Sequence, residues 1–184
     1  MVSASQLSRA DILAAFGELD RAFAERGVIG ELCLFGGAVM VLAFQARLST
    51  KDVDAVFQPS AVVREVAAEV GERRGWPSGW LNDGVKEFVS VRHEVSSGPL
   101  PQFPHLRLTM PSAGYLLAMK CLASRIGADA GESDDVADIV FLVRHLRLPT
   151  PTAVMELVAA YYPPDRVPVK AQFLVETLFT EGRV

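Results

Sequence analysis

Cysteine is scarce in this chain: Cys33 and Cys121 are the only two among 184 residues, and each lies inside an apolar stretch. This count indicates neither a disulfide framework nor a cysteine-rich zinc site, and it is typical of buried thiols in a cytosolic protein. The three histidines, at positions 93, 105 and 145, have no metal-ligand spacing. We interpret them as structural or surface residues.

The chain also lacks a run of 18 apolar residues, and its N-terminal segment has no basic region followed by an apolar one. We therefore expect a soluble cytoplasmic protein with no membrane partner. An excess of positive charge is missing too, because 22 acidic residues outnumber 18 basic ones. This balance argues against a protein that grips nucleic acid over its whole surface, and confines any such contact to a local basic patch.

Hydrophobic residues are plentiful, at 50% of the chain, and 184 residues suffice to bury a substantial core. Apolar spacing and helix-end signals predict helices over residues 8–26, 38–47, 60–74, 112–126, 133–146, 150–162 and 169–179. Ser112 and Ser133 are expected N-caps. Strands are predicted at residues 31–35, 52–57, 86–95 and 105–110. The fold class is therefore α+β: a small mixed sheet with packed helices over residues 1–110, and a helical region over residues 111–184.

Two carboxylates interrupt one of the predicted strands, in the stretch "RLSTKDVDAVF". Asp52 and Asp54 stand two residues apart, so in a strand they project from the same face. Like charges held so close persist when they are solvated, share a proton or hold a cation such as a hard divalent ion. A strand whose first residues are simply exposed to solvent is the competing interpretation.

The longer stretch "LFGGAVMVLAFQARLSTKDVDAVF" resembles the signature of the nucleotidyltransferase fold: a strand, a Gly-Gly or Gly-Ser turn, a helix and a strand with Asp-x-Asp. Fourteen residues separate Gly37 from Asp52. The AbiEii/MenT-like branch also carries a basic residue and a serine or threonine before the carboxylates. A later motif of that branch, a helical lysine followed by Asp-x-x-Asp, is similar to "YLLAMKCLASRIGADAGESDDVADIVFL". The matching positions are Gly36, Gly37, Arg47, Ser49, Thr50, Asp52, Asp54, Lys120, Asp135 and Asp138.

The resemblance implies an enzyme that transfers a nucleoside monophosphate from a nucleoside triphosphate to a hydroxyl and releases pyrophosphate. Asp52 and Asp54 would hold one or two Mg²⁺ ions. The nucleotide would lie against Gly36 and Gly37, which let the backbone approach phosphates, with Arg47, Ser49 and Thr50 as further contacts. Lys120 would place its charge near the phosphates or leaving group, and Asp135 or Asp138 would orient it or act as a base.

Each of these residues has a structural interpretation as well. The glycine pair is also typical of a tight strand-to-helix turn, and Lys120 of a surface lysine whose stem covers apolar residues. Negative charge at Asp135 stabilises the first turn of a helix in any case, although Asp138 lies one turn further in.

Members of this branch include toxins of bacterial toxin–antitoxin pairs that act on the tRNA 3′ end, so the implied partners are tRNA and a cognate antitoxin. Basic candidates for a tRNA contact are Arg64, Arg73, Arg74, Lys86, Arg92, Arg125, Arg144 and Arg147. The alternative is a catalytically idle module of the same fold that binds a nucleotide or a protein.

Two departures from the family pattern favour that alternative. The turn is Gly-Gly rather than Gly-Ser, which removes a hydroxyl. The third strand carboxylate of the wider superfamily has no clear counterpart, since residues 105–110 offer none and only Glu87 and Glu94 lie nearby.

Overall fold

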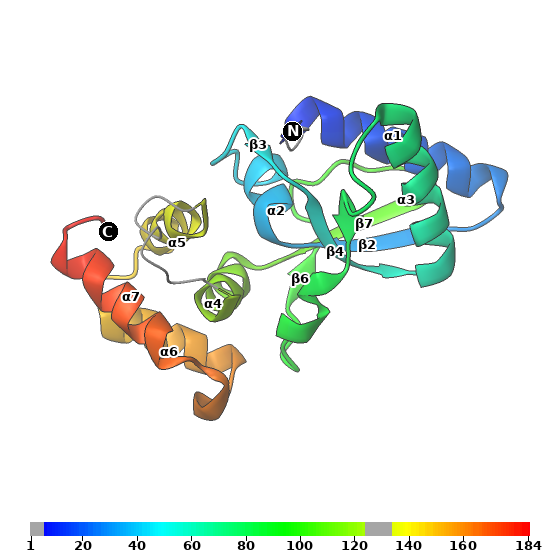
Figure 1. Cartoon of the computed structure of the whole chain (residues 1–184). Helices are drawn as coiled ribbons and strands as arrows, with labels where there is room; N and C mark the ends of the chain where they lie inside the picture. Colours follow the sequence, from blue (N-terminus) through cyan, green and yellow to red (C-terminus); the bar gives the residue numbers. More distant parts are fainter. Residues whose placement is uncertain (1–5, 124–133) are drawn as a thin grey trace. The chain divides into compact units, whose positions relative to one another are not determined.

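The computed structural model describes residues 6–123 and 134–184, and it confirms the α+β class. The chain divides into two compact units (Figure 1). The sheet unit comprises residues 1–87 and 95–110, and the helical unit comprises residues 88–94 and 111–184. Two of the sequence predictions, the N-cap Ser133 and the basic residue Arg125, lie outside the described residues.

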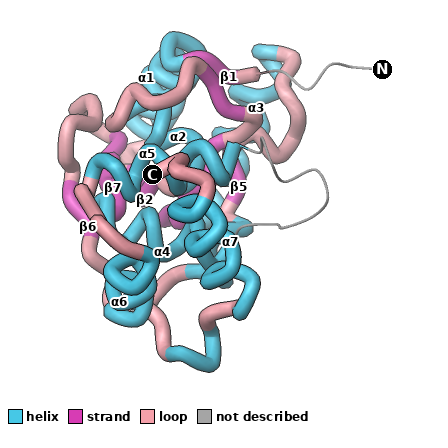
Figure 2. Tube along the Cα trace, turned by 90° about the vertical axis from the view of Figure 1, so that its left-hand side faces the viewer, coloured by secondary structure: helices cyan, strands magenta, loops and turns pink. Residues whose placement is uncertain are grey.

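Within the described residues, the sheet unit is built on a five-stranded mixed sheet in the order β5-β4-β2-β7-β6. The central strand β2 runs antiparallel to β4 and parallel to β7, and β5 runs parallel to β4. The strands of this sheet are β2 (Gly30–Leu34), β4 (Val53–Gln58), β5 (Leu81–Asn82), β6 (Val95–Ser96) and β7 (Leu106–Pro111). A short ribbon of β1 (Leu7–Ser8) and β3 (Ser49–Thr50) lies beside helix α1 (Figure 2).

Alternating burial along the strands gives this sheet two different faces. On β2, Leu32 and Leu34 are buried, whereas Glu31 and Cys33 point to the other side and are more accessible. Helix α1 (Arg9–Glu25) covers the buried face, and the Phe23 ring lies so close to Gly30 that a Cβ there would be 2.2 Å from it. Helix α3 (Ser60–Arg74) packs against α1 and β4. The other face of the sheet therefore carries the more accessible side chains, among them Glu31 and Cys33.

The predicted ends of α1 and α3 are confirmed. Ser8 is the N-cap of α1, and it forms a capping box in which Asp11 N donates to Ser8 Oγ and Ser8 N donates to Asp11 Oδ2. Helix α3 ends at Gly75, whose φ of 65° is the left-handed conformation that glycine adopts without strain. Local sequence signals fix both helices.

The helical unit contains α4 (Ala113–Ala123), α5 (Asp134–His145), α6 (Pro151–Tyr161) and α7 (Val169–Thr180). Helix α4 lies beside both α5 and α6, and α6 lies beside α7 (Figures 1 and 2). As predicted, Ser112 caps α4, because its Oγ accepts a hydrogen bond from Tyr115 N at 3.2 Å. Burial is heaviest on α4, where every residue from Tyr115 to Leu122 is buried.

The predicted strand over residues 86–95 is wrong. A 3₁₀ turn at Gly84–Phe88 is followed by irregular chain, and only Val95 enters a strand. Two tyrosines of the helical unit hold this segment: Ser90 N donates to Tyr115 Oη at 2.8 Å, and Ser90 Oγ donates to the Tyr161 carbonyl at 2.5 Å. Tyr161 Oη also donates to Glu94 Oε2 at 2.7 Å. These tertiary hydrogen bonds replace the partners that a strand would have needed.

Two helix-interior glycines allow a matched test of packing. Gly71 of α3 lies against the buried Trp80, and a Cβ there would be 2.9 Å from Trp80 Cδ1, whereas a Cβ on Gly17 of α1 would meet nothing within 4 Å. Gly17→Ala should stabilise the protein by about 0.5–1 kcal/mol through helix propensity. Gly71→Ala gains the same propensity but overpacks the site, and should be less stable than Gly17→Ala by about 1–3 kcal/mol. Urea denaturation measures both, and equal stabilities would contradict the packing at Trp80.

Candidate functional site

The glycine pair lies where β2 turns into helix α2 (Gly36–Leu42). Phe35 N donates to the Asp54 carbonyl at 2.8 Å, which ties this turn to the start of β4. Gly36 has a φ of 57°, and a Cβ on it would lie 2.7 Å from Asp54 Oδ2. Both the backbone conformation and the contact with the carboxylate therefore require glycine at this position.

Gly37 packs just as closely on the segment before the carboxylates. A Cβ on Gly37 would lie 2.3 Å from Thr50 Oγ1 and 3.2 Å from Arg47 Nη1. Thr50 is buried and pairs with Leu7 in the β1–β3 ribbon. The structure thus brings together five of the predicted residues, Gly36, Gly37, Arg47, Thr50 and Asp54, in the sheet unit.

Ser49, the other predicted nucleotide contact, has a structural partner. Its Oγ donates to Gln6 Oε1 at 3.1 Å on the exposed side of the β1–β3 ribbon. Helix α2 also ends at Leu42, five residues earlier than predicted. The chain leaves α2 through Gln45, which has a φ of 51°, and returns to β3. This reversal carries Arg47 and Thr50 to Gly37.

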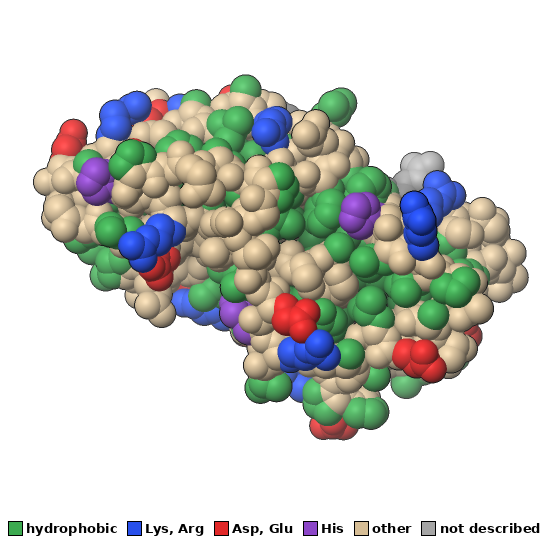
Figure 3. Space-filling view, turned by 180° about the vertical axis from the view of Figure 1, so that it is seen from behind, with side chains coloured by type: hydrophobic (Ala, Val, Ile, Leu, Met, Phe, Trp, Pro, Cys, Tyr) green, Lys and Arg blue, Asp and Glu red, His purple; other side chains and the backbone are tan. Residues whose placement is uncertain are grey.

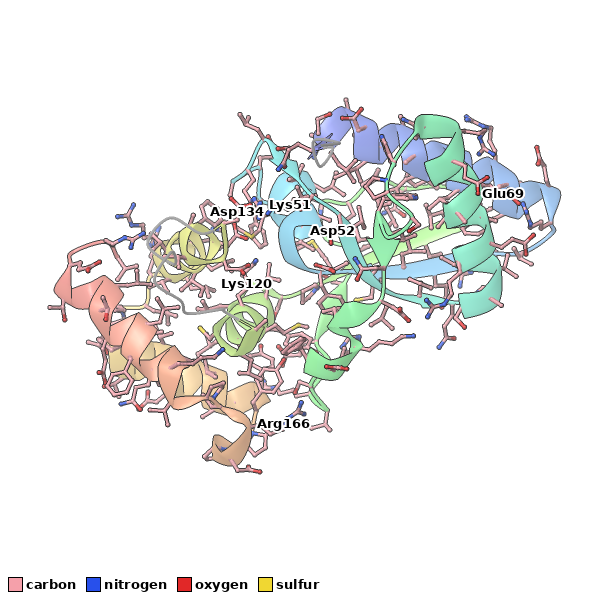
Figure 4. All side chains as sticks on the ribbon, in the orientation of Figure 1. Lys51, Asp52, Glu69, Lys120, Asp134 and Arg166 are labelled. Carbon is pink, nitrogen blue, oxygen red and sulfur yellow. The ribbon has the colours of Figure 1, made fainter. Side chains whose placement is uncertain are left out.

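Asp52 stands where the chain enters β4 (Figure 4), and its Oδ2 accepts a hydrogen bond from Asn82 Nδ2 at 3.3 Å. Burial raises the pKa of the Asp52 carboxyl, and the Asn82 hydrogen bond and the charges of Lys51 and Arg47 only partly oppose it. Asp52 is therefore a desolvated carboxylate, the condition under which a bound cation gives most stabilisation.

Asn82 is a member of this site that no sequence motif predicted. Strand β5 runs parallel to β4 with Asn82 opposite Asp54. Asn82 Oδ1 accepts from Gly84 N at 3.1 Å, which fixes the amide so that its Nδ2 points at Asp52. Its neighbourhood in "WLNDG" looks like turn chemistry, and only the strand register connects it with the carboxylates.

The second predicted motif forms a buried ion-pair cluster in the helical unit. Lys120, on α4 beside α5 (Figure 4), lies 2.7 Å from Asp138 Oδ2 and 3.0 Å from Asp135 Oδ1. Lys120 and Asp138 are buried, with 6% and 2% relative exposure, so the surface-lysine interpretation is wrong. Asp135 and Asp138 are one helical turn apart, which places both on the face of α5 that meets Lys120.

No third carboxylate projects from the described strands next to Asp52 and Asp54. Position 109 of β7, two strands from β4, is Thr109, in register with Cys33. Glu87 lies in the 3₁₀ turn, and Glu94 is bonded to Tyr161 in the helical unit. In the parts of the chain that the structure describes, no group of three or more His, Cys, Asp or Glu could hold a metal ion.

The chain matches no protein-family model, no curated protein and no solved structure. Over residues 6–123 and 134–184, no helix is both long and apolar enough to cross a membrane. The function is therefore inferred from the geometry of the residues themselves.

The raised pKa of Asp52 predicts a pH-dependent cost. The pKa of Asp52 is higher in the folded state than its unfolded value of about 3.9, so the protonated carboxyl favours the folded state. This contribution to stability is fully present below a pH of about 3.9 and is lost as the pH rises through the folded-state pKa. Asp52→Asn, which keeps an acceptor for Asn82, should raise the melting temperature at pH 7, and the gain should vanish as the pH falls below about 4. Thermal unfolding across this range measures the effect, and a variant less stable than the parent at pH 7 would refute it.

The ion-pair cluster predicts unequal roles for its two carboxylates in stability. Asp138→Asn leaves the buried Lys120 without its closest carboxylate and should cost about 3–5 kcal/mol. Asp135 has a side chain that is 47% exposed, so Asp135→Asn should cost no more than about 1 kcal/mol. Urea denaturation at pH 7 compares the two, and equal losses would show that Asp138 is not the main partner of the lysine.

Proposed function

We propose that this chain is a Mg²⁺-dependent nucleotidyltransferase, which moves a nucleoside monophosphate from a nucleoside triphosphate to an acceptor hydroxyl. The observation that carries the proposal is the contact of the two glycines with Asp54, Thr50 and Arg47. Because both glycines lack a Cβ, Asp54, Thr50 and Arg47 pack directly against the turn, which gathers a carboxylate suited to a cation and a guanidinium suited to phosphate. This supports the AbiEii/MenT-like resemblance, since the glycine turn and the Asp-x-Asp strand of its first motif meet in the sheet unit.

The residues present fit Mg²⁺. Proteins usually bind this ion through one or two carboxylates, with substrate phosphates and water completing an octahedron, so a third carboxylate is not required. Asp52 and Asp54 would hold it, and the desolvation that raises the pKa of Asp52 favours a cation there. An ion held there would supply positive charge that offsets the charge of the phosphates.

The remaining residues supply charge and a proton acceptor. The acceptor oxygen forms a bond to the α-phosphorus, the bond to pyrophosphate breaks, and the hydroxyl proton must be removed. Arg47 supplies positive charge for the phosphates. A second cation at Lys120 and the roles of Asp135 and Asp138 rest on the resemblance, because these three residues belong to the helical unit. Asp138 is buried against the lysine, which suits an orienting role, whereas the more exposed Asp135 suits proton acceptance.

The acceptor is the less supported part of the proposal. Many of the basic residues expected to contact tRNA pair with acidic side chains: Arg64 and Lys86 with Asp83, Arg73 and Arg74 with Glu18, and Arg92 with Glu94. On the face shown in Figure 3, basic side chains are scattered and several adjoin acidic ones. A tRNA acceptor and a toxin role with a cognate antitoxin therefore rest on the resemblance.

One observation favours the alternative of an idle module that binds a nucleotide or a protein partner. Strand β7 carries Thr109 and no acidic residue on this face, and Glu31 of β2 pairs with Gln58 at the far end of β4, so no described strand places a third carboxylate beside Asp52 and Asp54. Such a module would retain nucleotide binding at Asp52 and Asp54 but transfer nothing.

Transfer of a labelled nucleotide distinguishes the two functions. The protein is incubated with Mg²⁺, each α-³²P-labelled nucleoside triphosphate in turn, and total bacterial tRNA, and label is sought on RNA and on protein. We expect transfer by the parent chain and a loss of at least about a hundredfold in Asp54→Asn. Asp165→Asn, in the 3₁₀ turn Pro164–Arg166, is the matched control and should keep full activity.

Nucleotide binding without transfer, by a protein that melts cooperatively, would favour the idle module. Neither binding nor transfer with any of the four nucleotides would refute both the transferase and a nucleotide-binding module, and would leave only a module that binds a protein.

A further inference from the structure

The accessible face of the sheet carries three rows of side chains that cross its strands. Asp54, Val56 and Gln58 alternate along β4 on this face, about 7 Å apart. The register places Cys33 beside Val56 and Thr109 beside Cys33, which makes a row of small, half-buried side chains across β4, β2 and β7. The same register places Glu31 beside both Gln58 and Arg107, which makes a polar row.

These last two rows line a hollow of about 260 Å³ in the sheet unit. Pockets for whole drug-sized ligands span roughly 300–1,000 Å³, so this hollow suits one ring system better than a complete nucleotide. Three strands make its floor about 10 Å wide. One edge of the hollow is the polar row, and the opposite edge faces the row that contains Asp54.

The floor and the edge differ in chemistry. Burial raises the pKa of the Cys33 thiol, against a weaker effect of its hydrogen bond with Thr109, so the floor is uncharged at neutral pH. The edge contains a glutamine amide, a carboxylate and a guanidinium, and Arg107 Nη1 lies 3.0 Å from Glu31 Oε1, which orients both charged groups. Gln, Arg and Glu are side chains that read the hydrogen-bonding edges of adenine, guanine and cytosine respectively.

We propose that this hollow binds a nucleobase, with the ring on Cys33 and Val56 and the base edge against Gln58, Glu31 and Arg107. The inference rests on the proposed nucleotidyl transfer, because the Asp54 row then places phosphate on the side of the hollow opposite the polar row. Apolar side chains beneath a base and polar side chains at its edge are the usual means of recognising an unpaired base. The base comes either from the nucleoside triphosphate or from the terminal residue of an RNA acceptor.

Two variants test the hollow without touching the carboxylates. Cys33→Phe fills the floor, and Cys33→Ala, which leaves the hollow open, is its matched control. Arg107→Ala alters the polar edge at a side chain that is 65% exposed, so it tests the site even where Cys33→Phe fails to fold. Cooperative thermal unfolding establishes which variants are folded.

Three probes separate the base from the phosphates. Isothermal titration with Mg²⁺ and tripolyphosphate reports on the phosphate site alone, and titration with Mg²⁺ and each nucleoside triphosphate adds the base. Fluorescence anisotropy with a labelled single-stranded RNA oligonucleotide reports on an acceptor base. The parent should bind at least one nucleoside triphosphate at least tenfold more tightly than tripolyphosphate, or should bind the oligonucleotide.

If the base belongs to the triphosphate, Cys33→Phe should abolish the tenfold preference for a nucleoside triphosphate over tripolyphosphate. If the base belongs to the acceptor, Cys33→Phe should weaken oligonucleotide binding tenfold. Tripolyphosphate binding should be unchanged in either case. Arg107→Ala should change the preference among the bases, and Cys33→Ala should resemble the parent. Parent-like binding of every probe by folded Cys33→Phe, or by Arg107→Ala where Cys33→Phe does not fold, would overturn the inference and leave the proposed function standing. Failure of the parent to bind tripolyphosphate or any nucleoside triphosphate would overturn both.

Discussion

The absence of Cβ atoms at Gly36 and Gly37 is the constraint on which the geometry of the sheet unit depends. The turn after β2 touches Asp54 through one glycine and Thr50 through the other, so a methyl group at either would push the turn away from β4. The opposite side of the Thr50 segment is held by the start of α1, because Leu7 pairs with Thr50 and Arg9 Nη1 donates to the Leu42 carbonyl at 2.5 Å. Arg47 and the two aspartates therefore belong to one packed assembly rather than to a free loop.

The two units differ in how fully their buried charged side chains are paired. In the helical unit, Lys120 is buried with the Asp138 carboxylate and also pairs with the half-exposed Asp135, so its positive charge has two partners within the unit. In the sheet unit, Asp52 is desolvated with an amide and two nearby cations that do not fully offset the cost, and its pKa rises. The desolvated carboxylate of Asp52 is the kind of group that the proposed Mg²⁺ site would use, because a bound cation would offset its desolvation.

Local signals in the sequence were sufficient for the ends of α1 and α3, the glycine turn and the strand that Asp52 and Asp54 begin, because caps, glycines and alternation act within a few residues. They did not locate the end of α2, which lies five residues before the predicted one. They were insufficient where distant groups decide. Residues 86–95 alternate like a strand, yet Tyr115 and Tyr161, 25 and 71 residues from Ser90, take their hydrogen bonds. Asn82 joins Asp52 through the β4–β5 register, and no pattern within its own segment carries that information.

An idle module explains the missing third carboxylate more simply than an enzyme does, but it leaves the rest of the site unexplained. A connection between β2 and α2 could be made by many turns, and nothing in packing alone demands a left-handed glycine against a carboxylate oxygen. A desolvated charge persists where it serves a function, since exchanging Asp52 for a neutral side chain would remove the desolvation cost. Two carboxylates suffice when a substrate supplies the remaining oxygen ligands of Mg²⁺. The missing carboxylate therefore bears on the number of ions that the proposed site would hold. The glycines and Asp52 bear on phosphate binding, which a module that binds only a protein would not need, whereas a nucleotide-binding module shares it and differs from the enzyme only in transfer.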